Sequence, residues 1–236
     1  MDFKNTKITL ERPLASYEKV KAFIGWLLRG KRPFIKKSKS RATRYLDIGC
    51  GKNTSPDFIN LDYNWAPGVD IVWDITKGIP IEDGSLDGIF SEHCFEHISL
   101  RDLDFVLAEC FRILAPQGTI RIVMPDAELY LRGYAKETTI SNERHLPYAE
   151  HDAYNGMYSP IMSVNRIFRD HGHLFLYDFD CLKKLLQHNG FSNIAKREFS
   201  CGTNRLLCSK DTKAREIESL YVEASKELSR AANAND

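Results

Sequence analysis

The chain has 236 residues, with 33 Lys or Arg against 32 Asp or Glu. A net charge near zero argues against a nucleic-acid binder, and this length is enough for one well-cored domain. The first residues lack the apolar core of a signal peptide, no apolar run approaches a membrane span, and the six cysteines include no C-x-x-C pair. We therefore expect a cytoplasmic protein with reduced thiols.

The N-terminal region, residues 1–43, is expected to precede the main domain. Apolar residues between positions 20 and 28 recur at helical spacing, which predicts an amphipathic helix over about residues 15–29. Eight Lys or Arg and no acid follow between Arg29 and Arg44. Two interpretations remain open for residues 15–44: a helix on the sheet edge followed by a solvated linker, or a peripheral contact with an anionic membrane surface.

The remaining elements alternate between strands and helices. Short apolar segments ending in polar or turn residues predict parallel strands at 44–49, 58–62, 69–74, 86–91 and 119–126. Apolar stripes and caps predict helices at 100–114, 127–136 and 178–189, and two strands at 191–199 and 217–225 close the domain. The alternation predicts a three-layer α/β domain over residues 44–226, with a flexible tail at 227–236.

Residues 137–175 interrupt this alternation. The segment is rich in Tyr, His and Asn and has neither a helical nor a strand period. A loop of this length within a compact domain is typical of a functional lid or of disorder. Its aromatic and polar side chains would suit a sugar-like ligand, although core packing or a protein contact would use the same tyrosines.

Polar residues follow the predicted strands at the sheet edge where α/β domains bind ligands. They lie at Asp47–Gly51, Asp62, Asp74, Ser91–His93 and Asp126. Gly49 and Gly51 would let the backbone approach a ligand closely, and Asp62 is placed to accept hydrogen bonds from ribose hydroxyls. The dinucleotide fingerprint and the P-loop are absent. A carboxylate at Asp47 would repel a pyrophosphate, but it suits a ligand with an amine and a sulfonium, such as S-adenosylmethionine.

These motifs also carry a family resemblance. The stretch "LDIGCG" is similar to the first motif of the class I S-adenosylmethionine-dependent methyltransferases, and "INLD", "LAECFRILAPQGTIRIVMPD" and "RDHGHLFLYDFDCLKKLLQHNGF" extend the likeness over about residues 44–225. The resemblance implies a Rossmann-like fold with a mostly parallel seven-stranded sheet. Within the superfamily the chain resembles a type 11-like branch often met in polysaccharide and lipopolysaccharide biosynthesis.

The resemblance assigns the methionine end of the cofactor to three strand ends. Asp47 would orient the methionine amine, the backbone of Gly49, Cys50 and Gly51 would run along the methionine portion, and Ser91 would lie near the reacting end. From its own setting, Cys50 is expected to be a small turn residue and not a nucleophile. The product would be S-adenosylhomocysteine.

The resemblance assigns the nucleoside to the next two strands. Asp62 would bind the ribose with Tyr63 against the adenine, and Asp74 would meet the adenine amino group with Ile75 packed on its ring. Gly49 and Asp62 are thirteen positions apart, whereas a full intervening helix needs about 20. The first helix is therefore expected to be reduced to a turn.

A hydroxyl acceptor requires a base to take its proton, and histidine titrates in the useful range. The candidates are His93, the pair His171 and His173, which would point the same way in an extended segment, and Asp126 at the fifth strand end. Each also has a structural interpretation: the histidines could pin the insertion, and Asp126 could cap the following helix.

Two other histidine arrangements give weaker indications of a functional role. His97, beside Glu96 and just before a helix cap, is expected to be structural. A metal site begun by His171 and His173, with His145, His151 and Asp152 as further ligands, matches no zinc signature, so no metal is expected.

Together the residues predict a methyltransferase that acts on an oxygen of a saccharide or sugar conjugate by in-line transfer. A methyltransferase for another small molecule and a non-catalytic S-adenosylmethionine-binding module remain alternatives. No nucleic-acid partner is expected, and the sequence leaves the oligomeric state open.

Overall fold

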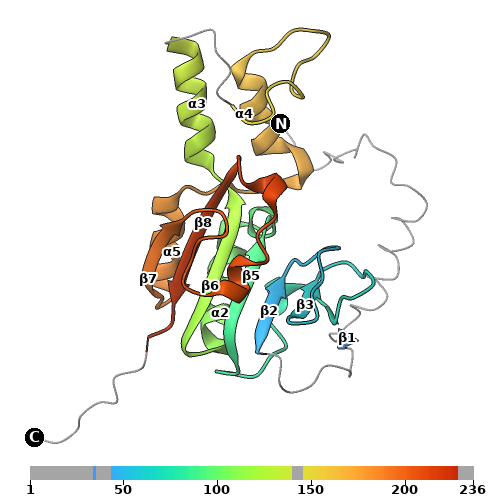
Figure 1. Cartoon of the computed structure of the whole chain (residues 1–236), viewed down its shortest axis with the longest axis vertical. Helices are drawn as coiled ribbons and strands as arrows, with labels where there is room; N and C mark the ends of the chain where they lie inside the picture. The colour runs from blue at the N-terminus through green and yellow to red at the C-terminus, as the bar shows by residue number, and fades with distance from the viewer. Residues whose placement is uncertain (1–33, 36–43, 140–145, 228–236) are drawn as a thin grey trace, which may run out of the picture.

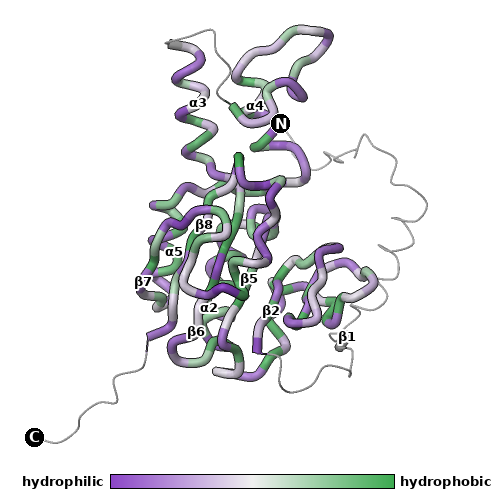
Figure 2. Tube along the Cα trace, in the orientation of Figure 1, coloured by the Kyte–Doolittle hydropathy of each residue, from purple (hydrophilic) through white to green (hydrophobic). Residues whose placement is uncertain are grey.

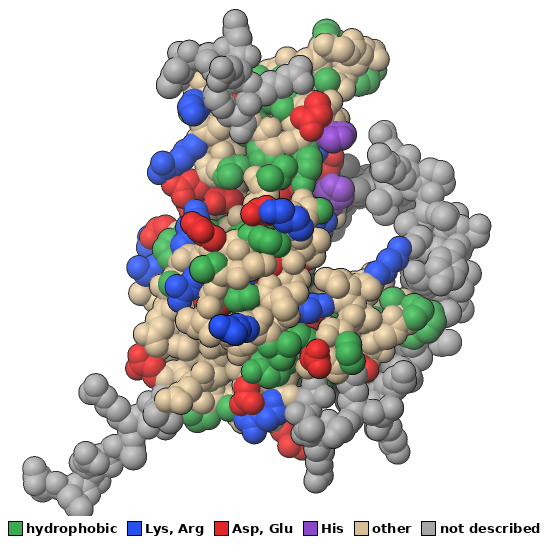
Figure 3. Space-filling model, in the orientation of Figure 1, with side chains coloured by type: hydrophobic (Ala, Val, Ile, Leu, Met, Phe, Trp, Pro, Cys, Tyr) green, Lys and Arg blue, Asp and Glu red, His purple; other side chains and the backbone are tan. Residues whose placement is uncertain are grey.

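A computed structural model describes residues 34–35, 44–139 and 146–227 (Figure 1). The predicted helix at 15–29, nearly all of the basic linker, and the tail from residue 228 lie outside the described residues. None of the described helices is long and apolar enough to cross a membrane. On the face shown in Figure 3, basic and acidic side chains of the described residues are interspersed.

One mixed sheet organises the described residues, in the order β1-β4-β3-β2-β5-β6-β8-β7. Its strands are β1 Phe34–Ile35, β2 Tyr45–Ile48, β3 Ile59–Asp62, β4 Ile71–Val72, β5 Leu86–Glu92, β6 Leu114–Pro125, β7 Ser192–Arg197 and β8 Ser219–Ser225. Neighbouring strands from β4 to β6 are parallel, whereas β8 is antiparallel to both its neighbours. Strands β2 to β8 confirm the predicted mostly parallel seven-stranded sheet, and the short β1 adds an antiparallel edge within the predicted linker.

The helical elements lie between the strands and in the insertion. They are η1 Ile75–Lys77, η2 Phe95–His97, α2 Leu100–Ile113, α3 Ala127–Thr139, α4 Pro160–Arg169, η3 Asp170–Gly172, α5 Phe179–His188, α6 Arg205–Cys208 and η4 Lys213–Arg215. The capping residues predicted from the sequence begin two of them: Ser99 accepts a hydrogen bond from the Asp102 backbone at α2, and Asp178 accepts one from Cys181 at α5.

One face of the sheet carries the main apolar core. Alternate residues of β2, β5, β6 and β8 point toward α2 and α5, and Leu46, Ile89, Ile122 and Val222 are each at most 1% exposed. The central strands are correspondingly hydrophobic in Figure 2. Each such side chain contributes roughly 1.5–3 kcal/mol by leaving water.

The opposite face is covered in a different way. No helix lies between β2 and β3, so the predicted shortening of the first helix is confirmed. Instead, the connection between β7 and β8, residues 198–218, folds back over this face and packs Leu207 against Phe58, Phe90 and Tyr221. The third layer is therefore one short helix, α6, with its flanking turns.

This connection also neutralises charges that the sheet presents to it. The Arg121 guanidinium, fully buried on β6, forms ion pairs with Asp211 at 2.5 Å and with Glu223 of β8 at 3.1 Å. Its other donors reach the carbonyls of Glu198 and Cys201. Lys210, which directly precedes Asp211 in the chain, forms an ion pair with Asp47 of β2 at 2.8 Å. Two consecutive residues of one connection thus satisfy buried charges on two strands.

The insertion forms a small helical unit at the carboxyl ends of the strands, where α3 and α4 stand side by side (Figure 1). The expectation that this segment has no regular structure is wrong for α4. Pro160 at the first turn follows Ser159, and the helix buries only Ser163 and Ile167. Ile161, Val164, Ile167 and Phe168 do recur at helical spacing, but only over ten residues within a long segment rich in Tyr, His and Asn.

Candidate functional site

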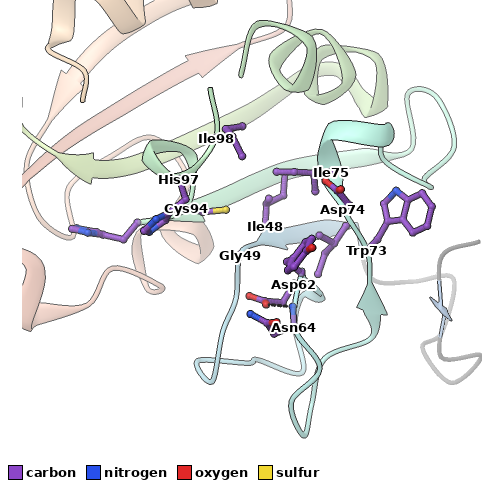
Figure 4. A pocket seen from close by; sticks show the side chains of 13 residues that line it. Ile48, Gly49, Asp62, Asn64, Trp73, Asp74, Ile75, Cys94, His97 and Ile98 are labelled. Atoms are coloured by element: carbon purple, nitrogen blue, oxygen red, sulfur yellow. Dashed lines mark hydrogen bonds between the residues drawn. The ribbon is translucent and has the colours of Figure 1, made fainter. Parts of the chain in front are cut away.

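A pocket of about 400 Å³ lies at the carboxyl ends of β2 to β5. We call it the strand-end pocket. Gly49, Asp62, Tyr63, Asp74, Ile75 and His93, all predicted as site residues, line it, and Asn64, Trp73, Cys94 and His97 complete much of its wall. Figure 4 shows Trp73, Asp74 and Ile75 at one end and Cys94 with His97 at the other, with Gly49 and Asp62 between them. These residues, which follow separate strands, therefore lie around one crevice, as the sequence pattern predicts.

Gly49 is required by the shape of this pocket. Its φ is +75°, and a Cβ there would lie 2.5 Å from the Cβ and Sγ of Cys94. Its N–H donates to the Leu61 carbonyl at 2.8 Å, which ties the turn after β2 to β3. The chain can therefore pass Cys94 at this distance only without a side chain.

Asp62 holds the loop that borders the pocket. Its Oδ2 accepts from the Gly51 backbone at 2.9 Å, and its Oδ1 accepts from the Asn64 backbone at 2.6 Å. Gly51 has a φ of +53° and open space around its Cα. Because a carboxylate has about four acceptor positions, Asp62 keeps capacity for ligand hydroxyls while it orders the turn.

The far end of the pocket combines a carboxylate with apolar surface. Asp74 caps η1 through hydrogen bonds from the Thr76 backbone at 3.1 Å and hydroxyl at 2.7 Å. These bonds, with Lys77, hold the pKa of Asp74 below its usual value although burial opposes them. Ile75 is buried, and the Trp73 indole donates to the Gly78 carbonyl at 2.8 Å, which fixes its ring at the rim.

Asp47 does not line the strand-end pocket. Its side chain is buried, with Lys210 at 2.8 Å, and the same ammonium group donates to the Asn53 carbonyl. Burial raises the pKa of Asp47 to about 6, against the attraction of Lys210. The structure therefore places this carboxylate as an anchor for Lys210 beneath the turn at residues 50–53.

Two further predicted cofactor residues lie behind the pocket wall. Cys50 is buried, and burial raises the pKa of its thiol, as expected for a turn residue that is not a nucleophile. Ser91 is buried on β5, and its hydroxyl has no hydrogen-bond partner among the described residues. Neither residue lines the strand-end pocket.

A second, more polar cavity of about 220 Å³ adjoins the first. We call it the histidine cavity. It shares His93 and His97 with the strand-end pocket and adds Glu96, His171 and His173, with Arg166 and Arg215 at its border. The predicted histidines therefore do gather at one place, although they come from two distant segments.

Glu96 lies at the centre of this cluster. Its side chain is fully buried, and neither oxygen accepts a hydrogen bond from another residue among those described. Its Oε1 lies 3.4 Å from His93 Nδ1, 3.9 Å from His97 Nε2 and 4.0 Å from His173 Nε2. Burial raises the pKa of Glu96 to about 8.

The imidazoles are held by their other nitrogens. His173 Nδ1 lies 2.6 Å from the Ile167 carbonyl, and because a carbonyl only accepts, this nitrogen donates. His93 Nε2 is 2.8 Å from the Ser219 hydroxyl. Burial lowers the pKa of both rings, that of His93 to about 3, so both are neutral at neutral pH.

His171 and Asp126 occupy different settings. His171 lies at the exposed side of the histidine cavity, with a φ of +60°. Asp126 instead caps α3, because its Oδ1 accepts from the Glu128 backbone at 3.0 Å and its Oδ2 pairs with Lys196 at 3.1 Å. It lines neither pocket, so the structure does not bring Asp126 together with the histidines.

Sequence reasoning missed several residues of the site. His97 was expected to be structural, and no pattern drew attention to Glu96, Lys210 or Arg166. Glu96 and His97 follow the fourth predicted strand, and His171 and His173 end the insertion. The sequence alone would have allowed these two groups of residues to be considered together. Lys210 could not have been found in this way, because its ion-pair partner Asp47 lies 163 positions away in the sequence.

A family model described as a methyltransferase domain matches residues 17–196. Similar solved structures include an S-adenosylmethionine-dependent methyltransferase from Archaeoglobus fulgidus (18% identity, 90% of this chain and 95% of that chain, TM-score 0.47). The YcgJ protein of Bacillus subtilis is similar at 14% identity (81% and 94% of the two chains, TM-score 0.47).

A phosphoethanolamine N-methyltransferase of Haemonchus contortus, solved with S-adenosylhomocysteine, is similar at 14% identity, over 81% of this chain and 50% of that chain, with a TM-score of 0.46. No curated protein matches the sequence. The family model covers well over half of the chain, and the strand order fits its fold. The chain belongs to the methyltransferase domain family and is an S-adenosylmethionine-dependent methyltransferase.

Proposed function

We propose that the strand-end pocket binds S-adenosylmethionine and that the histidine cavity binds a polar, saccharide-like acceptor, which is methylated on a hydroxyl oxygen. The observation that carries this proposal is that the two cavities share His93 and His97. A methyl group at the end of the first cavity would therefore face the second.

The strand-end pocket suits the nucleoside in its charge and shape. The Asp62 carboxylate would accept hydrogen bonds from the ribose hydroxyls. Asp74 would accept one from the adenine amino group, with Ile75 on the ring face and Tyr63 opposite. Tyr63 is 52% exposed in the described structure, so binding would cover it.

The methionine portion would run past Gly49 toward Cys94 and His97 (Figure 4). Asp47 would help only indirectly, through the loop that Lys210 joins to it. This differs from the role that the resemblance implies for Asp47, and it follows from the burial of that carboxylate.

The histidine cavity favours a polar acceptor with hydroxyl groups. Imidazole and guanidinium groups form much of its wall, and its volume fits one ring-sized group. Arg166 and Arg215 are already paired with Asp152 and Glu218, so the cavity offers little net positive charge to an anionic acceptor.

The chemical step is an in-line displacement at the methyl carbon. The acceptor oxygen forms the new C–O bond while the C–S bond breaks, and its electron pair stays on sulfur as the neutral thioether of S-adenosylhomocysteine. The hydroxyl proton passes to His171, at the solvent side of the cavity. Alignment of the two reactants would supply much of the rate, about 7–11 kcal/mol in well-oriented systems.

Calorimetric titration with S-adenosylhomocysteine tests the cofactor half. We expect Asp62→Ala to weaken binding at least about tenfold, since the loss of hydrogen bonds to a charged group costs about 1.5–3 kcal/mol. Asp57→Ala, in an exposed turn of the same loop, is the matched control and should bind as the parent protein does. Equal affinity for the Asp62 variant would mean that the ribose lies elsewhere.

Methyl transfer to a panel of hydroxylated saccharides, catechols and amines tests the acceptor half. We expect transfer to saccharide hydroxyls, with a rate about 10²- to 10⁴-fold lower in His171→Ala. His188→Ala, an exposed histidine at the end of α5, should retain the full rate. Transfer only to amine nitrogens, unaffected by the His171 change, would exclude the proposed acceptor class.

A further inference from the structure

The cluster around Glu96 contains more ligating capacity than a proton-transfer site needs. One carboxylate oxygen and the ring nitrogens of His97 and His173 all lie within 4.8 Å of one another. His93 Nδ1 lies closer still to the same oxygen, at 3.4 Å. These atoms converge from η2 and from the segment after η3, which meet where the Leu174 N–H donates to the Glu96 carbonyl at 2.8 Å.

The buried carboxylate lacks the partners that such a group normally has. A buried carboxyl group in a protein is paired, protonated or bound to a metal, since an unpaired buried charge is costly. Glu96 has no Lys or Arg among its ion-pair partners in the described residues, and neither of its oxygens accepts a hydrogen bond from another residue there. The three groups that face its oxygens are the imidazoles of His93, His97 and His173.

The orientation of His173 also favours a metal ion at this cluster. Because its Nδ1–H donates to the Ile167 carbonyl, Nε2 is the ring nitrogen left to bind another group, and it lies 4.0 Å from Glu96 Oε1. Metal-ligating histidines characteristically donate their second nitrogen to a carbonyl in this way.

We propose that Glu96, His97 and His173 bind a divalent metal ion of the zinc type, which would leave one position of a tetrahedral site open. Two ligand atoms about 2.0–2.2 Å from a tetrahedral zinc lie about 3.4 Å apart. The three ligand atoms lie within 4.8 Å of one another, with 3.9 and 4.0 Å between Glu96 Oε1 and the two imidazoles, so binding would draw them together by up to about 1.4 Å. Imidazole nitrogen favours zinc, iron or nickel over magnesium, which prefers oxygen. This site goes against the sequence expectation of no metal.

The metal would lie where the two cavities meet, since His97 lines both. An acceptor hydroxyl at an open coordination position would lose its proton more readily, because a cation stabilises the resulting alkoxide. This role rests on the proposed hydroxyl acceptor, whereas the metal site does not. The test therefore uses no acceptor and no methyl donor.

The full chain, stripped of metal with a chelator, is titrated with Co²⁺, and ligand-field absorption in the visible range is followed. Calorimetry with Zn²⁺ and with Mg²⁺ runs alongside. We expect one equivalent of Co²⁺ to give the spectrum of a low-coordinate nitrogen and oxygen site, one Zn²⁺ to bind, and Mg²⁺ not to bind.

The Glu96→Gln variant replaces the carboxylate with an amide of the same shape, and His97→Ala removes a partly exposed ligand. Each should weaken metal binding at least about tenfold. His151→Ala, an exposed histidine beside Glu150, is the control for adventitious binding and should behave as the parent protein. Thermal unfolding of each variant checks that it folds.

A parent protein that gives no Co²⁺ spectrum and no Zn²⁺ isotherm would overturn the proposal. So would equal binding by folded Glu96→Gln and His97→Ala proteins, because the metal would then bind elsewhere. Binding that is lost in both variants but kept in the control would establish the site, even if the acceptor later proved not to be a hydroxyl.

Discussion

At the scale of single residues, Gly49 and Gly51 have the same left-handed backbone but different surroundings. Gly49 has a φ of +75° and would place a Cβ against Cys94, whereas Gly51 has a φ of +53° with nothing within 4 Å. Substituting each glycine by alanine therefore separates the cost of backbone strain from the cost of the steric overlap with Cys94.

We expect Gly51→Ala to lower the free energy of unfolding by about 1–2 kcal/mol, the cost of the left-handed conformation for a residue with a Cβ. Gly49→Ala should lose that amount and a further 1–3 kcal/mol from the overlap with Cys94. Urea unfolding of both variants measures the difference. Equal losses would show that the turn after β2 can move away from Cys94.

The predicted site residues that line the strand-end pocket are those that directly follow a strand. Gly49, Asp62 and Asp74 each follow a strand directly, so the strand pattern alone places them at one edge of the sheet. Asp47 shows the limit of such reasoning. Its position in the motif is visible, but its burial against Lys210 depends on a connection far along the chain.

At the scale of elements, the connection over residues 198–218 takes the place of a covering helix, and its attachment depends on charge. Arg121 joins it to β6 through Asp211, and both side chains are fully buried. Glu223 of β8, also buried, accepts from Arg121, Arg197 and the Thr203 backbone.

Arg121→Met should therefore destabilise the protein by about 3–5 kcal/mol, because it leaves two buried carboxylates without their shared cation. Arg132→Met is the matched control, since Arg132 is 81% exposed and pairs with Glu128 within one helix. It should cost less than about 1 kcal/mol. Chemical denaturation of the two variants checks this. A loss of similar size in both would show that the connection is held by Leu207 and its apolar neighbours alone.

This connection and α4 are the elements that the sequence did not predict. Strands β2, β3, β5, β6 and β8 carry buried apolar runs, and α2 and α5 carry caps and stripes, so local pattern was sufficient. The short α6 and its turns are specified by contacts with distant strands. The apolar period of α4 is present but spans only ten residues of a long polar insertion, so it does not stand out in a scan of the whole segment.

At the scale of the whole molecule, the sheet and the α3–α4 unit are joined by one polar network. Arg166 of α4 pairs with Asp152 at 2.6 Å and donates to the Tyr130 hydroxyl of α3 at 3.0 Å. That hydroxyl in turn donates to Glu218, just before β8, at 3.2 Å. Because Arg166 also borders the histidine cavity, this network fixes the wall of the proposed acceptor site.

Without the Arg166 guanidinium, the Asp152 carboxylate, only 3% exposed, would lose its cation and α4 would lose its hydrogen bond to the Tyr130 hydroxyl of α3. In Arg166→Met we expect amide hydrogen exchange to accelerate across residues 146–169, while β5 and β6 keep their protection because their hydrogen bonds and core are untouched. Arg169→Met, exposed at the end of the same helix, should leave exchange unchanged. Faster exchange throughout the sheet in Arg166→Met would instead mean that the two parts unfold as one cooperative unit, and the helical unit could not then open separately to admit an acceptor.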